Sequence, residues 1–179
     1  MIDLKEIFAE CVKRGIQQKE KEFTQLMKLI VNNKYKSVLE IGAYSNGCTY
    51  AFSQICESVV SIDLEHKSHE KIKNVFYIWG DSHSPTIISK LNLPNPDKFD
   101  VIFIDGDHTY AGVRQDYENY KDLCNAGGII CFHDIWDTPE HSRLNCFVSK
   151  LWNELKQEND FIEFGGDIQT WGGIGILLK

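Results

Sequence analysis

Five carboxylates follow five short apolar stretches of this sequence, each at or just after the end of a predicted strand. They are Glu40, Asp63, Asp81, Asp105 and Asp134. The carboxyl ends of parallel strands meet at one edge of a sheet, and open α/β sheets bind ligands beyond that edge. We therefore expect these side chains to share one crevice, although a single aspartate at such a place is more often a turn or helix-capping residue.

The densest concentration of such residues lies in two stretches, FDVIFIDGDHTY at 99–110 and GGIICFHDI at 127–135. If these stretches supply neighbouring strands, Asp105, His133 and Asp134 converge above the sheet. Two carboxylates and an imidazole suit a divalent metal such as Mg²⁺, Mn²⁺ or Fe²⁺. The competing interpretation is that His133 and Asp134 only cap the loop before the next helix.

His108 lies close to the same edge and is a candidate general base, because an imidazole titrates near neutrality. Asp107 could orient it. A lone surface histidine usually has no such role, so this prediction depends on the acids around it.

The stretch VLEIGAYSNG at 38–47 predicts a strand, a glycine turn and the start of a helix. Gly42 lets the backbone turn where a Cβ would obstruct it, and Gly47 closes the loop. This geometry presents backbone N–H groups to a ligand. The spacing differs from the G-x-G-x-x-G pattern of dinucleotide folds, and an ordinary βα turn with convenient glycines is the alternative.

Two further acids complete a predicted nucleoside site. Asp63 lies about 20 residues beyond the glycine turn, where an acid accepts both hydroxyls of a ribose. Asp81 could accept from an adenine amine, with Ser82 supplying a backbone N–H. The same pocket would suit a nicotinamide oxidoreductase, although the missing second glycine of the G-x-G pattern argues against it.

Helical and strand patterns alternate along the chain from residue 37. This order predicts an α/β fold with a Rossmann-like, doubly wound, seven-stranded and mostly parallel sheet, helices on both faces and a C-terminal antiparallel hairpin. Strands are predicted at 37–41, 59–63, 75–79, 99–104, 129–132, 161–164 and 173–178, and helices at 3–14, 17–32, after 47, 65–73, 85–91, 110–124 and 137–157.

Length and composition indicate a single domain over residues 1–179, with an N-terminal helical cap (1–36) on an α/β core (37–179). The formal net charge of −7 argues against a nucleic-acid partner. No apolar run approaches a membrane span, and the first residues are unlike a signal peptide. Six scattered cysteines without a C-x-x-C pair favour a reduced, cytoplasmic protein. Apolar residues on the first helices could form a homodimer interface.

Together these motifs resemble the class I S-adenosylmethionine-dependent methyltransferases. The most similar branch includes the macrocin-type sugar O-methyltransferases and the cephalosporin hydroxylase-like proteins. The resemblance is carried by LEIGAYSNG, SIDLE, WGDS, IDGDHTYAGVRQD and GGIICFHD, which span residues 38–135 in the family's order. It implies a seven-stranded sheet whose last strand is inserted antiparallel.

The resemblance also implies roles for individual residues. Asp105 and Asp134 match the acids that bind metal in metal-using relatives, whereas His133 stands where the sugar enzymes tend to carry an acidic residue. The implied S-adenosylmethionine contacts lie on Glu40, Gly42, Ala43, Tyr44 and Gly47 for the methionine part, Asp63 and Leu64 for the ribose, and Asp81, Ser82 and Asp105 for the remainder.

The leading functional hypothesis is O-methylation of a small hydroxylated acceptor, such as a sugar or a natural product, with His108 and Asp105 as catalytic residues. A divalent metal at Asp105, His133 and Asp134 could favour the acceptor alkoxide. A non-catalytic module that binds the nucleoside remains the main alternative, because the chain is short and lacks insertions for an acceptor.

Overall fold

The computed structural model describes residues 3–65, 71–91, 98–165 and 171–179. Within them a seven-stranded sheet runs in the order β3-β2-β1-β4-β5-β7-β6. The first five strands are parallel, and β7 is antiparallel to both of its neighbours, as predicted. The strands are β1 (Ser37–Ile41), β2 (Ser58–Asp63), β3 (Val75–Trp79), β4 (Phe99–Ile104), β5 (Cys124–His133), β6 (Phe161–Phe164) and β7 (Ile174–Leu178).

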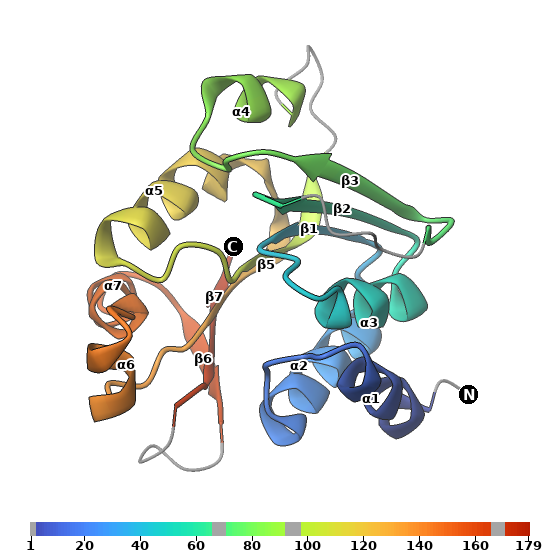
Figure 1. The fold of residues 1–179 in the computed structure, drawn as a ribbon, viewed down its shortest axis with the longest axis horizontal. Helices are drawn as coiled ribbons and strands as arrows, with labels where there is room; N and C mark the ends of the chain where they lie inside the picture. Colours follow the sequence, from blue (N-terminus) through green and yellow to red (C-terminus); the bar gives the residue numbers. More distant parts are fainter. Residues whose placement is uncertain (1–2, 66–70, 92–97, 166–170) are drawn as a thin grey trace.

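Helices cover both faces of the sheet (Figure 1). The N-terminal helices lie with α3 on one face, and the later helices lie on the other. The first group is α1 (Leu4–Lys13), α2 (Glu20–Asn33) and α3 (Gly47–Ile55). The second is α4 (Pro85–Leu91), α5 (Tyr110–Tyr120), α6 (Pro139–Arg143) and α7 (Val148–Leu155), with a short 3₁₀ turn at Lys121–Leu123.

The central strands bury both faces, because their side chains alternate between two cores. On β4, Val101 and Phe103 pack with α1, α2 and α3, whereas Ile102 and Ile104 pack with α4, α5 and α7. This doubly wound arrangement creates a switch point between β1 and β4, where the chain leaves the sheet on opposite sides. The predicted Asp105 crevice lies at this point.

Most predicted elements are confirmed within a few residues, and the main correction concerns the helix predicted over 137–157. It is two helices, α6 and α7, separated at Leu144–Phe147. Asn145 has φ 55°, a left-handed conformation that a continuous helix cannot accommodate. The helix predicted at 65–73 lies mostly outside the described residues, and 71–73 are not helical.

Two boundaries also differ from the predictions. The helix predicted to end at 124 ends at Tyr120, and β5 begins at Cys124 rather than 129. The helix predicted from 17 begins at Glu20, because Lys19 is extended and its backbone N–H donates to Glu22 Oε1 at 3.1 Å, a helix cap. Residues 17–19 therefore precede the helix, and Gln17 and Gln18 lie at the carboxyl ends of the parallel strands instead of on a helical stripe.

All six cysteines fall in described segments, and each is buried with a free thiol. Within the described ranges, no helix combines the length and apolarity that a membrane crossing requires.

We expect the aromatic core on the N-terminal side to be essential for stability. Phe103 is fully buried, with its ring centroid 5.4 Å from that of Phe52 and 6.4 Å from that of Phe23. Phe103→Ala should lower the free energy of unfolding by about 3–5 kcal/mol in urea denaturation, because it leaves a cavity. Phe76→Ala, at a β3 position that is 65% exposed, is the control and should change it by less than about 1 kcal/mol. Equal losses would contradict this account.

Candidate functional site

A cavity of about 1380 Å³ opens at the carboxyl ends of the parallel strands. Four of the five strand-end acids line it, so the expected convergence is found for Asp63, Asp81, Asp105 and Asp134. The predicted site residues that line the cavity are Gly42, Tyr44, Asp63, Leu64, Asp81, Ser82, Asp105, His108, His133 and Asp134. Glu40, Ala43 and Gly47 are not among the residues that line it.

Glu40 lies beneath the glycine turn and is fully buried. Its Oε2 accepts hydrogen bonds from Thr49 Oγ1 and Ser61 Oγ, both at 2.5 Å. Its Oε1 is buried without a hydrogen-bond partner. Burial raises the pKa of Glu40 to about 7, even though both hydroxyls favour the charged form.

The glycine turn is held by its contacts with neighbouring strands. Gly42 has φ 93°, and a Cβ there would lie 2.1 Å from the carbonyl oxygen of Asp105, so only glycine fits. Asp63 fastens the other side, because its carboxylate accepts from the backbone N–H of Tyr44 at 2.7 Å and of Glu65 at 2.9 Å. The loop is therefore preorganised by the same acid that was predicted to bind a ribose.

At the end of β3 a second polar cluster shapes the cavity. Asp81 Oδ1 accepts from the backbone N–H of His83 at 2.9 Å, and the hydroxyl of Ser82 donates to Asp116 at 2.7 Å. Asp116 is fully buried, and its carboxylate lies 3.2 Å from His83 Nε2. The Ser82 side chain thus faces inward, which is consistent with the predicted use of its backbone.

Asp105 is the centre of the polar network. Its Oδ1 lies 3.0 Å from His108 Nε2 and 3.2 Å from His133 Nδ1, and its Oδ2 accepts from Gln18 Nε2 at 2.5 Å. Burial opposes the charged form of the carboxylate, yet the neighbouring imidazoles of His133 and His108 hold the pKa of Asp105 well below its usual range.

The two histidines show the reciprocal effect. Burial opposes their charged forms, but hydrogen bonding to Asp105 and the charge of Asp134 raise the pKa of His108 to about 11. The charge of Asp105, its hydrogen bond and that of Glu22 raise the pKa of His133 to about 10. Both imidazoles are therefore protonated at neutral pH in this arrangement.

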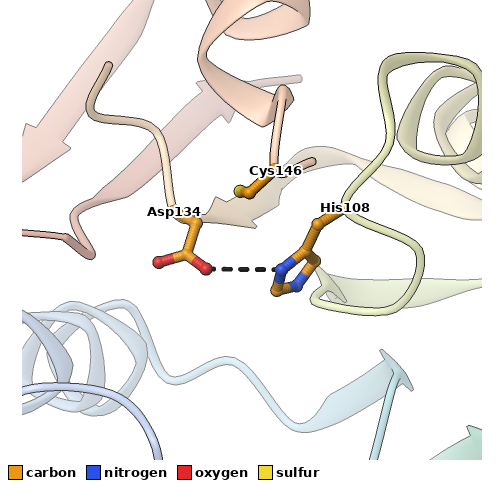
Figure 2. A group of neighbouring side chains, drawn as sticks. All are labelled: His108, Asp134 and Cys146. Atoms are coloured by element: carbon orange, nitrogen blue, oxygen red, sulfur yellow. Dashed lines mark ion pairs between the residues drawn. The ribbon is translucent and has the colours of Figure 1, made fainter. Parts of the chain in front are cut away.

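Asp134 directly follows β5 and has φ 61°, a left-handed conformation that is unfavourable for most residues other than glycine. Figure 2 shows its carboxylate pointing toward His108, with Oδ2 3.4 Å from His108 Nδ1. Oδ1 lies 3.2 Å from His141 Nε2 and 3.5 Å from His133 Nδ1, but it is buried and accepts no hydrogen bond. Backbone strain of this kind is common at functional sites.

The predicted metal-ligand set Asp105, His133 and Asp134 does come together, with His133 Nδ1 between the two carboxylates. A second group of potential ligands is His108, Asp134 and Cys146, whose ligand atoms all lie within 4.8 Å of one another. Asp107, which was expected to orient His108, instead accepts from the backbone N–H of Thr109.

Sequence reasoning missed the contribution of the N-terminal segment. Glu22 is buried, and its carboxylate lies 3.1 Å from His133 Nε2 and accepts from Gly173 N at 2.7 Å. Glu22 precedes Leu26 and Ile30 at helical i, i+4, i+8 spacing, so an acid on an apolar stripe was the available signal. His141 and Cys146 gave no comparable signal, because a continuous helix was expected over 137–157 and the break between α6 and α7 was not.

The histidine pKa shifts predict a dependence of stability on pH in the metal-free protein. In the unfolded chain, His108 and His133 release their imidazole protons at about pH 6.5. Above that pH the folded state binds more protons than the unfolded chain, so the free energy of unfolding falls as pH rises through 7 toward the folded pKa values of about 10 and about 11. We expect a loss on the order of 1 kcal/mol per pH unit for each histidine in urea denaturation.

His108→Gln is the matched variant for this experiment. It should reduce the pH dependence between about pH 6.5 and 8 by about one proton's share, because His108 no longer titrates while His133 and His141 still do. An unchanged slope would show that the protons bound on folding belong to other groups.

The model of a family described as "Methyltransferase domain" matches residues 19–135. A curated relative, an uncharacterized protein of Acanthamoeba polyphaga mimivirus, is 45% identical over 61 residues, which are 34% of this chain and 28% of that protein.

Several solved methyltransferases share the fold. MycE from the mycinamycin biosynthetic pathway, solved with Mg and SAH, is 16% identical with a TM-score of 0.73; the match covers 99% of this chain and 54% of MycE. TomG from Streptomyces achromogenes, solved with SAM, is 15% identical with a TM-score of 0.72 over 99% and 91%. A putative caffeoyl-CoA O-methyltransferase from Staphylococcus aureus is 19% identical with a TM-score of 0.71 over 100% and 93%.

The match to MycE thus spans about half of that protein, and the match to the viral protein spans little more than a quarter of it. The family match, in contrast, covers well over half of this chain and includes the glycine turn, the strand-end acids and the residues 133–135. The chain therefore belongs to this methyltransferase-domain family.

Proposed function

We propose that this protein transfers a methyl group from S-adenosylmethionine to an oxygen of a small hydroxylated acceptor, such as a sugar or a natural product. The observation that carries the proposal is the cavity at the β1–β4 switch point, which is lined by the glycine turn and four strand-end carboxylates. Its relatives support the chemistry, since MycE was solved with Mg, SAH and mycinamycin VI, and TomG with SAM.

The methyl donor would lie along the ends of β1, β2 and β3. Asp63 already accepts two backbone N–H groups, and each carboxylate oxygen retains a lone pair for a ribose hydroxyl. Asp81 would accept from the adenine amine. The unpartnered Oε1 of buried Glu40 would receive the methionine ammonium through a bridging water, because Glu40 itself does not line the cavity.

The volume of the cavity supports a second substrate. Binding sites for drug-sized ligands typically measure about 300–1000 Å³, and this cavity of about 1380 Å³ is larger. The part beyond Asp105 is lined by His108, Glu140, Leu144 and Trp171, a mixed polar and apolar surface. We propose that the acceptor binds there, with its hydroxyl facing His108.

The same site has donors that fit a divalent metal. Asp134 Oδ1 is buried and unsatisfied, and His133 Nδ1 lies between it and Asp105. We propose that Asp105, His133 and Asp134 hold the ion, with Glu22 orienting the ring of His133 from its other nitrogen. A divalent ion there would lower the pKa of an acceptor hydroxyl.

His108 is the proposed proton acceptor. It is partly buried at the cavity wall, with its Nε2 3.0 Å from Asp105 Oδ1. Because its raised pKa keeps it protonated beside Asp105 and Asp134, it becomes a base only when positive charge binds near those carboxylates and lowers that pKa. His108 would thus remove the proton of the acceptor hydroxyl only after positive charge has bound beside Asp105 and Asp134.

The donor site can be tested by calorimetric titration with S-adenosylmethionine and its demethylated product. We expect binding by the natural chain and at least about a tenfold loss of affinity in Asp63→Asn, which removes a charge-assisted acceptor. Asp122→Asn, an exposed acid beyond α5, is the control and should bind normally. Absence of binding at millimolar ligand would refute the proposed function.

Turnover can be tested with a labelled methyl donor and a panel of hydroxylated acceptors. His108→Gln should lower kcat by about 10²–10⁴-fold while leaving donor affinity unchanged, as expected for loss of a general base. Donor binding without turnover on any acceptor would favour a non-catalytic nucleoside-binding module. An unchanged kcat in His108→Gln would remove His108 from the mechanism.

A further inference from the structure

His108, Asp134 and Cys146 form a cluster with the donor chemistry of a zinc site. They come from three separate places, the loop after β4, the end of β5 and the connection between α6 and α7, yet their ligand atoms lie within 4.8 Å of one another (Figure 2). In a tetrahedral site with metal–nitrogen and metal–oxygen bonds near 2.0–2.1 Å, neighbouring donors are about 3.4 Å apart. The distance from His108 Nδ1 to Asp134 Oδ2 is 3.4 Å.

The imidazole is already oriented for such a role. Its Nε2 lies 3.0 Å from Asp105 Oδ1, which leaves Nδ1 facing Asp134 and Cys146. A metal-binding histidine almost always donates its other N–H to a carboxylate or carbonyl, which fixes the tautomer and the ring. Asp105 therefore acts here as the supporting carboxylate.

The thiol is fixed by the backbone around it. The N–H of Cys146 donates to the carbonyl of His141 at 2.8 Å, and the next N–H, of Phe147, donates to the carbonyl of His108 at 2.8 Å. These bonds attach the α6–α7 connection to the loop that carries His108. Cys146 is only 5% exposed but lines the cavity, so an ion entering the cavity can reach its sulfur.

Asp134 supplies the oxygen ligand of the cluster. Its Oδ2 lies 3.4 Å from His108 Nδ1, whereas its Oδ1 lies 3.2 Å from His141 Nε2 and 3.5 Å from His133 Nδ1. The two oxygens therefore face different sets of donors, and Oδ2 is the one placed to bind an ion beside His108.

We propose that His108, Asp134 and Cys146 bind a thiophilic divalent ion of the Zn²⁺ class, with the fourth position open to the cavity. A thiolate and an imidazole select Zn²⁺ or Co²⁺ over Mg²⁺ and Ca²⁺, which prefer oxygen ligands. On binding, the proton of the Cys146 thiol and the proton on His108 Nδ1 pass to solvent, and the metal takes both lone pairs without any change of oxidation state.

This site shares His108 and Asp134 with the proposed methyl transfer and would control it. The ion would take the lone pair of His108 that the proposed reaction needs and would share Asp134 with the proposed oxygen-rich set. If both proposals hold, Zn²⁺ inhibits the transferase and a chelator restores it. The ion-binding experiment below requires no turnover, so its failure is distinguishable from failure of the proposed function.

Cobalt provides a direct test with the full chain. Co²⁺ added to the metal-free protein should give a thiolate-to-cobalt charge-transfer band in the near ultraviolet, because Cys146 is a ligand. Cys146→Ser should lose that band and bind Zn²⁺ at least about tenfold more weakly. The matched control is Cys56→Ser, whose thiol contacts the Tyr35 carbonyl far from the cavity, and it should retain the band.

Alkylation of Cys146 in the natural chain tests the same proposal without a substitution, so the result does not depend on whether a variant folds. Zn²⁺ should slow alkylation of Cys146 by iodoacetamide in the natural chain, as mapped by mass spectrometry, whereas Mg²⁺ should not. A cobalt spectrum without a thiolate band, a band that survives Cys146→Ser, or alkylation of Cys146 that Zn²⁺ leaves unchanged would each overturn the proposal.

Discussion

The site depends on the buried carboxylate of Asp105 and the charges that surround it. Its two oxygens contact His108, His133 and Gln18, which come from the β4 loop, the end of β5 and the segment before α2. Removing one member of a buried ion pair costs several kcal/mol, because the partner is left uncompensated. The geometry at the carboxyl ends of the strands therefore depends on charged and polar groups from three segments that compensate one another. The strands hold these segments in fixed positions.

The N-terminal helices are part of this balance and not only a cover for the sheet. Glu22 contacts His133 and the backbone of Gly173, so α2 fastens the end of β5 to the turn before β7. Gln18 bridges Asp105 and the thiol of Cys48 on α3. The same α2 face that buries Phe23 and Leu26 in the core thus fixes polar side chains at its start, which joins stability to the geometry of the site.

Periodicity and strand-end chemistry sufficed to predict the sheet, its antiparallel hairpin and the convergence of Asp63, Asp105 and Asp134, because these follow from local pattern and parallel topology. Periodicity did not predict the break at Asn145, although asparagine is one of the residues that most readily adopt the left-handed backbone found there. That break brings Cys146 to His108. Glu22 and His133 are 111 positions apart in the sequence, so local sequence patterns cannot predict their contact.

The protons on the histidines explain why so many carboxylates can be buried at one edge. Glu22, Asp105 and Asp134 face His133, His108 and His141, and the charges of these acids raise the pKa of each histidine despite burial. A cation entering the cavity therefore competes with protons that already neutralise the carboxylates. The affinity for any divalent ion should therefore rise with pH. Ions that form strong bonds to nitrogen or sulfur should bind best, because those bonds offset most of the free-energy cost of removing the protons.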